Sequence, residues 1–186
     1  MSAFYELPRT LTVDGVEYPI RTDYRAVLQA ISQTHNQDLS PIEKADWMCF
    51  VLYKDWDSIP NQQEAMEQAC RFIDCGRDWK GKSKAPRVMD WEKDWNMIAP
   101  ACSRVAGRSI REMPYLHWWD FIGLYQEIGE CSFSTVVAIR HKIARGKKLE
   151  KWEQDYKREH PELFNLNSIG EDLIDLLEQI RGGESL

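Results

Sequence analysis

The spacing of apolar residues along the chain predicts a mainly α protein with one short β-hairpin near its start. Within residues 4–21, Leu11 and Val13 alternate with polar residues before Asp14-Gly15, a pair that suits the positive φ angles of a two-residue turn. Beyond the hairpin, apolar residues recur three and four positions apart, which is the period of a helix with one buried face. We therefore expect a bundle of six or seven helices on which the hairpin packs, because two strands alone are marginally stable.

The first two helices have recognisable start signals. Thr22 or Asp23 can cap the first helix. Ser40, Pro41 and Glu43 start the second: the serine can cap it, proline is favoured at the first helical position, and a glutamate three residues after the cap completes a capping box. We therefore expect the second helix to begin directly after residue 40.

This second helix carries apolar residues over most of its circumference. Ile42, Ala45 and Cys49 lie on one stripe, and Trp47 and Phe50 widen it. A helix that is apolar on most sides is typical of the centre of a core. We expect it to be central and covered.

Further helices are predicted by the same spacing. They cover residues 60–75, 90–107, 113–129, 132–146 and 169–180. Pro100 is expected to kink the helix that begins near Asp90, and the helix over 113–129 is apolar nearly all round. We assign residues 1–160 to one helical domain and residues 161–186 to a C-terminal amphipathic helix, a docking appendage.

Charge is unevenly distributed along the chain. There are 24 basic and 30 acidic residues, a net charge of -6, yet the stretches 77–87 and 140–158 are both basic. Opposed patches favour contact with other proteins or with copies of the same chain. The acidic balance argues against nucleic acid as a partner, because binding to phosphates requires a basic surface.

The sequence also bears on location and chemistry. No apolar run approaches the ~20 residues of a transmembrane helix, and the start of the chain lacks a secretory pattern, so we expect a cytoplasmic protein with no membrane partner. The five cysteines cannot all pair and contain no CxxC, which favours free thiols in a reducing compartment.

Nothing in the sequence has the pattern of a catalytic or metal centre. GxSxG, GxGxxG, GxxxxGK[ST] and HExxH are absent. His117 could serve as a base or a metal ligand, but its apolar surroundings favour a hydrogen-bonded histidine at the edge of the core. We predict that the protein is not an enzyme and needs no metal or cofactor.

Three groups of residues are the predicted partner contacts. The basic loop around Trp79 is either a flexible surface loop or a contact for an acidic partner. The apolar stripe of the last helix either docks into a partner or closes its own bundle. With Trp152, the candidates are Trp79, Lys80, Lys82, Lys84, Arg87, Trp152, Leu173, Leu176, Leu177 and Ile180. The other six tryptophans, at 47, 56, 91, 95, 118 and 119, are expected to be mainly core residues.

Several short motifs occur in a characteristic order. The most specific is Leu116-His117-Trp118-Trp119-Asp120-Phe121. The others are Ile20-Arg21-Thr22-Asp23-Tyr24-Arg25, Glu43-Lys44, Phe72-Ile73-Asp74-Cys75-Gly76, Asp90-Trp91-Glu92-Lys93-Asp94-Trp95 and Ile139-Arg140. Over residues 10–158 the chain thereby resembles the gene-product-fifteen family of tailed phages. We expect its signature residues to lie in the core: Leu116, His117, Trp118, Trp119, Phe121, Asp90, Trp91, Asp94 and Trp95.

The resemblance implies a tail assembly chaperone. Proteins of this kind are thought to bind the long helical tape measure protein, keep it soluble, and help the major tail protein to polymerise around it. The resemblance also implies self-association, a place in the host cytoplasm during phage assembly, and absence from the mature virion. The alternatives are a permanent structural or connector protein of the tail and a nucleic-acid-binding accessory protein.

Overall fold

The computed structural model describes residues 6–34, 38–77, 86 and 88–166. Contacts within the chain divide it into two units. Among the described residues, unit 1 comprises those within 1–82 and 115–122, and unit 2 comprises those within 83–114 and 123–166. Each unit therefore combines segments that are distant in sequence.

The described residues form a mainly α fold with one antiparallel hairpin, which confirms the predicted fold class. In unit 1 the elements are β1 (Thr10–Val13), β2 (Val16–Pro19), α1 (Tyr24–Gln33), α2 (Pro41–Leu52), the 3-10 helix η2 (Trp56–Ser58) and α3 (Gln62–Ile73). In unit 2 they are α4 (Trp95–Ala106), η3 (Ile110–Glu112), α6 (Ser132–Ala144), α7 (Lys151–Glu159) and η4 (Pro161–Phe164). Helix α5 (Trp118–Gln126) begins in unit 1 and ends in unit 2. No helix among the described residues is long and apolar enough to cross a membrane.

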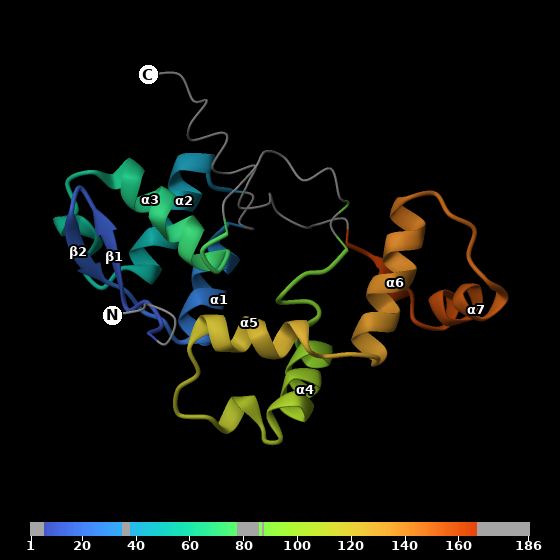
Figure 1. The fold of residues 1–186 in the computed structure, drawn as a ribbon. Coiled ribbons are helices and arrows are strands. Elements are labelled where there is room, and N and C mark those ends of the chain that lie inside the picture. The colour runs from blue at the N-terminus through green and yellow to red at the C-terminus, as the bar shows by residue number, and fades with distance from the viewer. Residues whose placement is uncertain (1–5, 35–37, 78–85, 87, 167–186) are drawn as a thin grey trace. The chain divides into compact units, whose positions relative to one another are not determined.

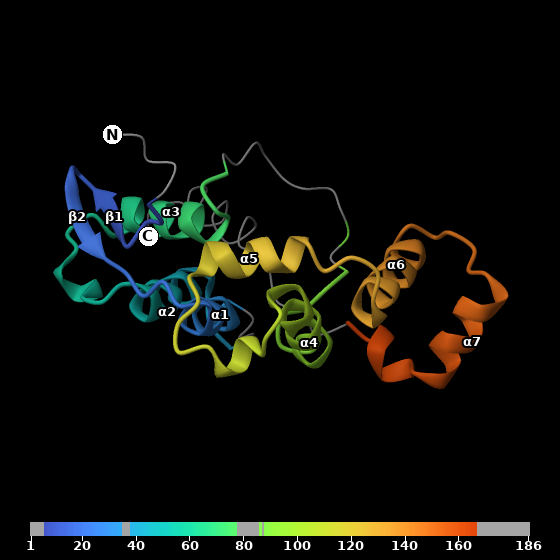
Figure 2. The ribbon, with the colours of Figure 1, turned by 60° about the horizontal axis from the view of Figure 1, so that its bottom comes forward.

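The hairpin has the turn that its sequence predicts. Asp14 and Gly15 both have positive φ angles, 49° and 78°, and Val13 pairs with Val16 across the turn. Strand β1 packs beside α3, as Figures 1 and 2 both show. The turn is tied to that helix, because the Asp14 backbone N–H donates to the Glu64 carboxylate at 2.9 Å.

The first two helices begin where the capping residues predict. Asp23 caps α1 by accepting from the Arg25 backbone N–H. Ser40 caps α2 in a capping box, in which the Glu43 side chain accepts from the Ser40 backbone N–H at 2.8 Å. These caps satisfy amide groups that have no partner inside the helix.

Helix α4 begins later than the apolar spacing predicts. Residues 91–94 form a turn, and the helix starts at Trp95. The Asp90 carboxylate accepts from the backbone N–H groups of Glu92 and Lys93 at 3.0 and 2.8 Å, so it organises the turn instead of the first turn of a helix. Pro100 lies inside α4, which continues to Ala106.

One face of α2 is exposed, although the apolar spacing predicts a covered helix. Ala45, Met48, Cys49 and Leu52 are buried, in a helix that packs on α1 and α3. Ile42, Trp47 and Phe50 on the other side are 59%, 47% and 51% exposed. Within the described part of the chain α2 packs on α1 and α3 through its buried side, so the expectation that most of its circumference is covered is wrong.

Helix α7 is joined to α6 by a partly buried ion pair between Lys142 and Glu153. Its only buried residue is Glu153, whose carboxylate accepts a hydrogen bond from Lys142 of α6 and another from the Glu150 backbone N–H at 2.8 Å. The Lys142 hydrogen bond, followed by that of Glu150, lowers the pKa of Glu153 from its ordinary value of 4.5.

We predict that α7 loosens in acid. A carboxyl whose pKa is lower in the folded state stabilises the fold at neutral pH, and this stabilisation is lost as pH falls below the ordinary value of 4.5 and through the folded-state pKa. Amide hydrogen exchange of α7 should therefore accelerate relative to α1 as the pH is lowered. In Glu153→Gln, α7 should exchange faster at neutral pH and show a smaller acid response. An equal acid response in both proteins would contradict this role.

Candidate partner-binding surfaces

His117 makes internal contacts in unit 1. Its side chain is buried, and its Nδ1 atom accepts from the Trp119 backbone N–H at 3.1 Å. The proton therefore lies on Nε2, which donates to the Pro8 carbonyl at 3.0 Å. Because both ring nitrogens are engaged, neither is available to hold a metal or to transfer a proton. His117 fixes the segment before β1 to the start of α5.

The two tryptophans after His117 complete the end of α3. The Trp118 indole N–H donates to the Ile73 carbonyl at 2.7 Å, and the Trp119 indole N–H donates to the Phe72 carbonyl at 2.8 Å. The Ile73 carbonyl lies in the last turn of α3, where a helix supplies no N–H, so the Trp118 indole provides its donor. The Phe72 carbonyl accepts from the Trp119 indole in addition to the Cys75 backbone N–H at 3.0 Å. The Trp119 ring also covers Gly76, where an added Cβ would be 3.5 Å from it.

The motif Ile20–Arg25 also contacts the segment Leu116–Phe121. The Tyr24 backbone N–H donates to the Leu116 carbonyl at 3.0 Å, and the Leu116 N–H donates to the Asp23 carboxylate at 3.1 Å. The Tyr24 and Phe121 rings stack with centroids 4.9 Å apart. Three motifs that are far apart in sequence therefore meet in the core of unit 1.

Two further motifs, Asp90–Trp95 and Ile139-Arg140, meet in unit 2 at a buried ion pair, whereas Glu43-Lys44 lies in α2 of unit 1. Arg140 of α6 makes two hydrogen bonds to the Asp94 carboxylate, at 2.7 and 2.9 Å, and the two side chains are 5% and 1% exposed. The same guanidinium donates to the carbonyls of Val88 and Leu163 at 3.1 and 2.7 Å. Asp94 also accepts from the Asp90 backbone N–H at 2.9 Å. All of these hydrogen-bond partners of the charge pair lie within unit 2.

The tryptophans of the motif Asp90–Trp95 are only partly buried in unit 2. Trp91 and Trp95 are half-buried. The Trp91 ring packs on Tyr125 at 4.9 Å, and the Arg111 guanidinium lies 5.9 Å from the centre of the Trp95 ring. The signature residues thus range from fully buried to half-buried, with Leu116 and Trp119 also in the second class.

The exposed side of α2 is a candidate partner surface that the sequence pattern did not reveal. We call it the α2 face: Ile42, Trp47 and Phe50, with the acidic residues Glu43 and Asp46. The Trp47 and Phe50 rings meet edge to face with centroids 5.6 Å apart. A residue pattern that is apolar all round cannot show which side of a helix lacks a neighbour; only the acidic positions among these residues hint at it.

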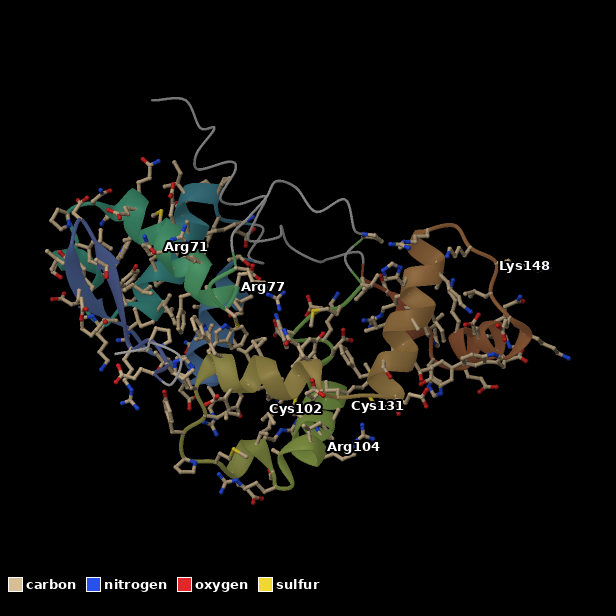
Figure 3. The ribbon with its side chains drawn as sticks, in the orientation of Figure 1. Arg71, Arg77, Cys102, Arg104, Cys131 and Lys148 are labelled. Atoms are coloured by element: carbon tan, nitrogen blue, oxygen red, sulfur yellow. The ribbon has the colours of Figure 1, made fainter. Side chains whose placement is uncertain are left out.

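A second candidate surface lies where α6 meets α7. Trp152 is 52% exposed and Ile143 is 37% exposed. The Trp152 indole N–H donates to Glu150 at 2.9 Å, and Lys142 Nζ lies 3.8 Å from the same carboxylate, so Trp152 is held beside the end of α6. The α6–α7 surface comprises these two apolar residues and the exposed cations Arg145, Lys147, Lys148 and Lys151. Figure 3 shows Lys148 in the loop between the two helices.

Most of the predicted partner contacts lie outside the described residues. These are Trp79, Lys80, Lys82, Lys84 and Arg87 of the basic loop and Leu173, Leu176, Leu177 and Ile180 of the last predicted helix. Trp152 is the one candidate of that group within the described part of the chain. Its exposure leaves it available to a partner.

The comparisons with known proteins identify the family. The sequence pattern of the family described as Bacteriophage Gp15 protein matches residues 5–166. The chain belongs to the bacteriophage Gp15 family. Comparisons with curated proteins and with solved structures gave no match.

In this member of the Gp15 family, most of the recognisable motifs contain residues that join distant segments within one unit by hydrogen bonds or by an ion pair. The described part of the chain has no group of three or more His, Cys, Asp or Glu side chains placed to hold a metal ion. Burial raises the pKa of the Cys75 and Cys102 thiols to about 11, so both are protonated at neutral pH and are poor nucleophiles. Figure 3 shows Cys102 on α4 and Cys131 before α6; both are free thiols.

We predict that Trp118→Phe destabilises unit 1. The substitution keeps an aromatic ring but removes the N–H that donates to the Ile73 carbonyl, leaving a buried acceptor unsatisfied at a cost of about 1–3 kcal/mol. Urea unfolding measures this cost for the whole protein, and native-state hydrogen exchange of α3 locates it in unit 1. Trp152→Phe, at an exposed site, is the matched control and should change stability by less than about 0.5 kcal/mol. Equal effects of the two substitutions would contradict the structural role of Trp118.

We predict that Arg140→Met lowers the free energy of unfolding by more than Trp118→Phe does. The substitution leaves the buried Asp94 carboxylate without its ion partner, which typically costs about 3–5 kcal/mol. Hydrogen exchange in α6, read together with thermal unfolding, should show the loss in unit 2. The exposed pair Arg158 and Asp155 offers a control, since Arg158→Met should cost at most about 1 kcal/mol. If Arg140→Met unfolds no more readily than Arg158→Met, the buried pair does not hold the unit.

Proposed function

We propose that this Gp15 protein is a non-enzymatic tail assembly chaperone that binds the phage tape measure protein and keeps it soluble while the tail is built. Two observations support the proposal: the chain belongs to a phage family, and it exposes large aromatic side chains on rigid helices. Contiguous exposed apolar residues commonly mark protein interaction sites.

The α2 face carries the proposal furthest. Ile42, Trp47 and Phe50 are side chains that a folded protein usually buries. Helix α2 is fixed at its start by the capping box and along its buried side by packing on α1 and α3. A rigid helix that presents aromatic residues can bind the apolar side of another helix without ordering itself first. A long helical partner with an unburied apolar stripe is a suitable ligand for such a face.

The proposal includes a transient role. The protein would act in the host cytoplasm, with the major tail protein as a second partner, and would leave before the virion is complete. A permanent structural or connector protein of the tail would use the same exposed surfaces but would remain in the particle. Mass spectrometry of purified virions separates the two roles, because a chaperone should be missing from them.

Co-expression with the tape measure protein of the same phage tests the proposal. The tape measure protein should stay in the soluble fraction with this protein and precipitate with an empty vector. Trp47→Ser/Phe50→Ser should lose most of the effect, because the substitutions remove the aromatic contacts and leave the buried side of α2 intact. Val16→Ser changes an exposed apolar residue of the hairpin and should behave as wild type. The proposal fails if the tape measure protein precipitates equally with and without this protein.

A further inference from the structure

The segments that carry the described residues of the two units have opposite net charge. The segments Met1–Lys82 and Tyr115–Ile122 contain 9 basic and 14 acidic residues, whereas Ser83–Pro114 and Gly123–Ile169 contain 14 basic and 11 acidic ones. The separation extends to the two exposed apolar surfaces. The α2 face has Glu43 and Asp46 beside its aromatic residues, and the α6–α7 surface has four exposed cations beside Trp152.

We propose that copies of this protein associate head to tail, with the α2 face of one copy against the α6–α7 surface of the next. The two surfaces are complementary: Trp47 and Phe50 present apolar area beside two carboxylates, and Trp152 and Ile143 present apolar area beside four exposed cations and the one exposed carboxylate of Glu150. Contact would remove apolar side chains from water on both sides. It would also bring opposite charges together, which raises the rate and specificity of association.

Symmetric pairing of like surfaces is disfavoured by the same charges. Two α2 faces in contact would bring the Glu43 and Asp46 carboxylates of both copies together, and two α6–α7 surfaces would bring cations against cations. Juxtaposed like charges oppose association.

A head-to-tail contact has a consequence that a symmetric dimer lacks. Each bound copy keeps one unused surface of each kind at the ends of the assembly, so addition continues into a ring or a filament. Average mass should therefore rise with concentration beyond that of a dimer. It should fall when salt is added, because screening weakens the charge contribution.

Sedimentation of the purified full-length chain, without any phage partner, measures this association. The inference does not rest on the proposed function, so the two experiments can fail independently; if both proposals hold, a second copy and the tape measure protein compete for the α2 face. Trp47→Ser/Phe50→Ser and Lys147→Glu/Lys148→Glu should each weaken association by about tenfold or more, the loss expected when aromatic anchors or matched charges at an interface are removed. Val16→Ser and Val105→Ser, at exposed apolar sites outside both surfaces, should associate as wild type. Circular dichroism of all four variants should match wild type, because the changed side chains are exposed.

Mixing the two impaired variants gives the decisive result. Trp47→Ser/Phe50→Ser retains its α6–α7 surface, and Lys147→Glu/Lys148→Glu retains its α2 face, so together they should form one-to-one dimers that grow no further. A symmetric interface would not be restored by mixing. The proposal is overturned if wild-type protein stays monomeric at low salt, if both variants associate as wild type does, or if the mixture does not form dimers.

Discussion

The buried pair between Asp94 and Arg140 is the interaction on which unit 2 depends. Arg140 reaches the Asp94 carboxylate, the Val88 carbonyl and the Leu163 carbonyl, so one guanidinium joins the segment before α4, helix α6 and the 3-10 helix η4. Burying two charges costs several kcal/mol each unless their hydrogen bonds are satisfied. Here the bidentate geometry and the Asp90 amide meet most of that requirement. The arrangement favours one register between these elements over others that would leave a buried charge unpaired.

In unit 1 the corresponding links of the Leu116–Phe121 motif are hydrogen bonds from ring N–H groups to backbone carbonyls. The indoles of Trp118 and Trp119 donate to the last carbonyls of α3, and His117 links them to the start of the chain. Large apolar rings with one polar atom suit this task, since they bury area and satisfy a helix end together. The two units thus use different chemistry for the same purpose: each ties a segment from the middle of the chain to elements far from it in sequence.

Local features of the sequence predict much of this fold because they depend on near neighbours. The Asp14-Gly15 turn, the Ser40 capping box and the buried residues Met66, Ala69, Cys70 and Ile73 of α3 all follow from spacing and side-chain chemistry over a few positions. The start of α4 could not be predicted in this way. The Asp90 carboxylate accepts from the N–H groups two and three positions later, as a helix cap would, but here those residues form a turn before the helix. Which helices share a unit is likewise invisible to apolar spacing.

The candidate surfaces were harder to predict than the core. Trp152 stood out because its neighbours are charged, whereas Trp47 lies among apolar residues on a helix whose exposed side depends on how many neighbours the unit supplies. Asp94 and Arg140 are 46 positions apart, and either could have been a solvated surface charge. Long-range partnership, not residue type, decides these cases.

The discontinuous make-up of unit 1 has a consequence for synthesis on the ribosome. The Trp118 and Trp119 donors that complete α3 lie more than 40 residues after it, which at about 5–20 residues per second corresponds to a delay of roughly two to nine seconds. During that interval α3 lacks the rings that cover its last turn. Nascent chains shorter than residue 122 would therefore present this apolar end to other proteins, and a translation pause placed between α3 and α5 would lengthen the exposure.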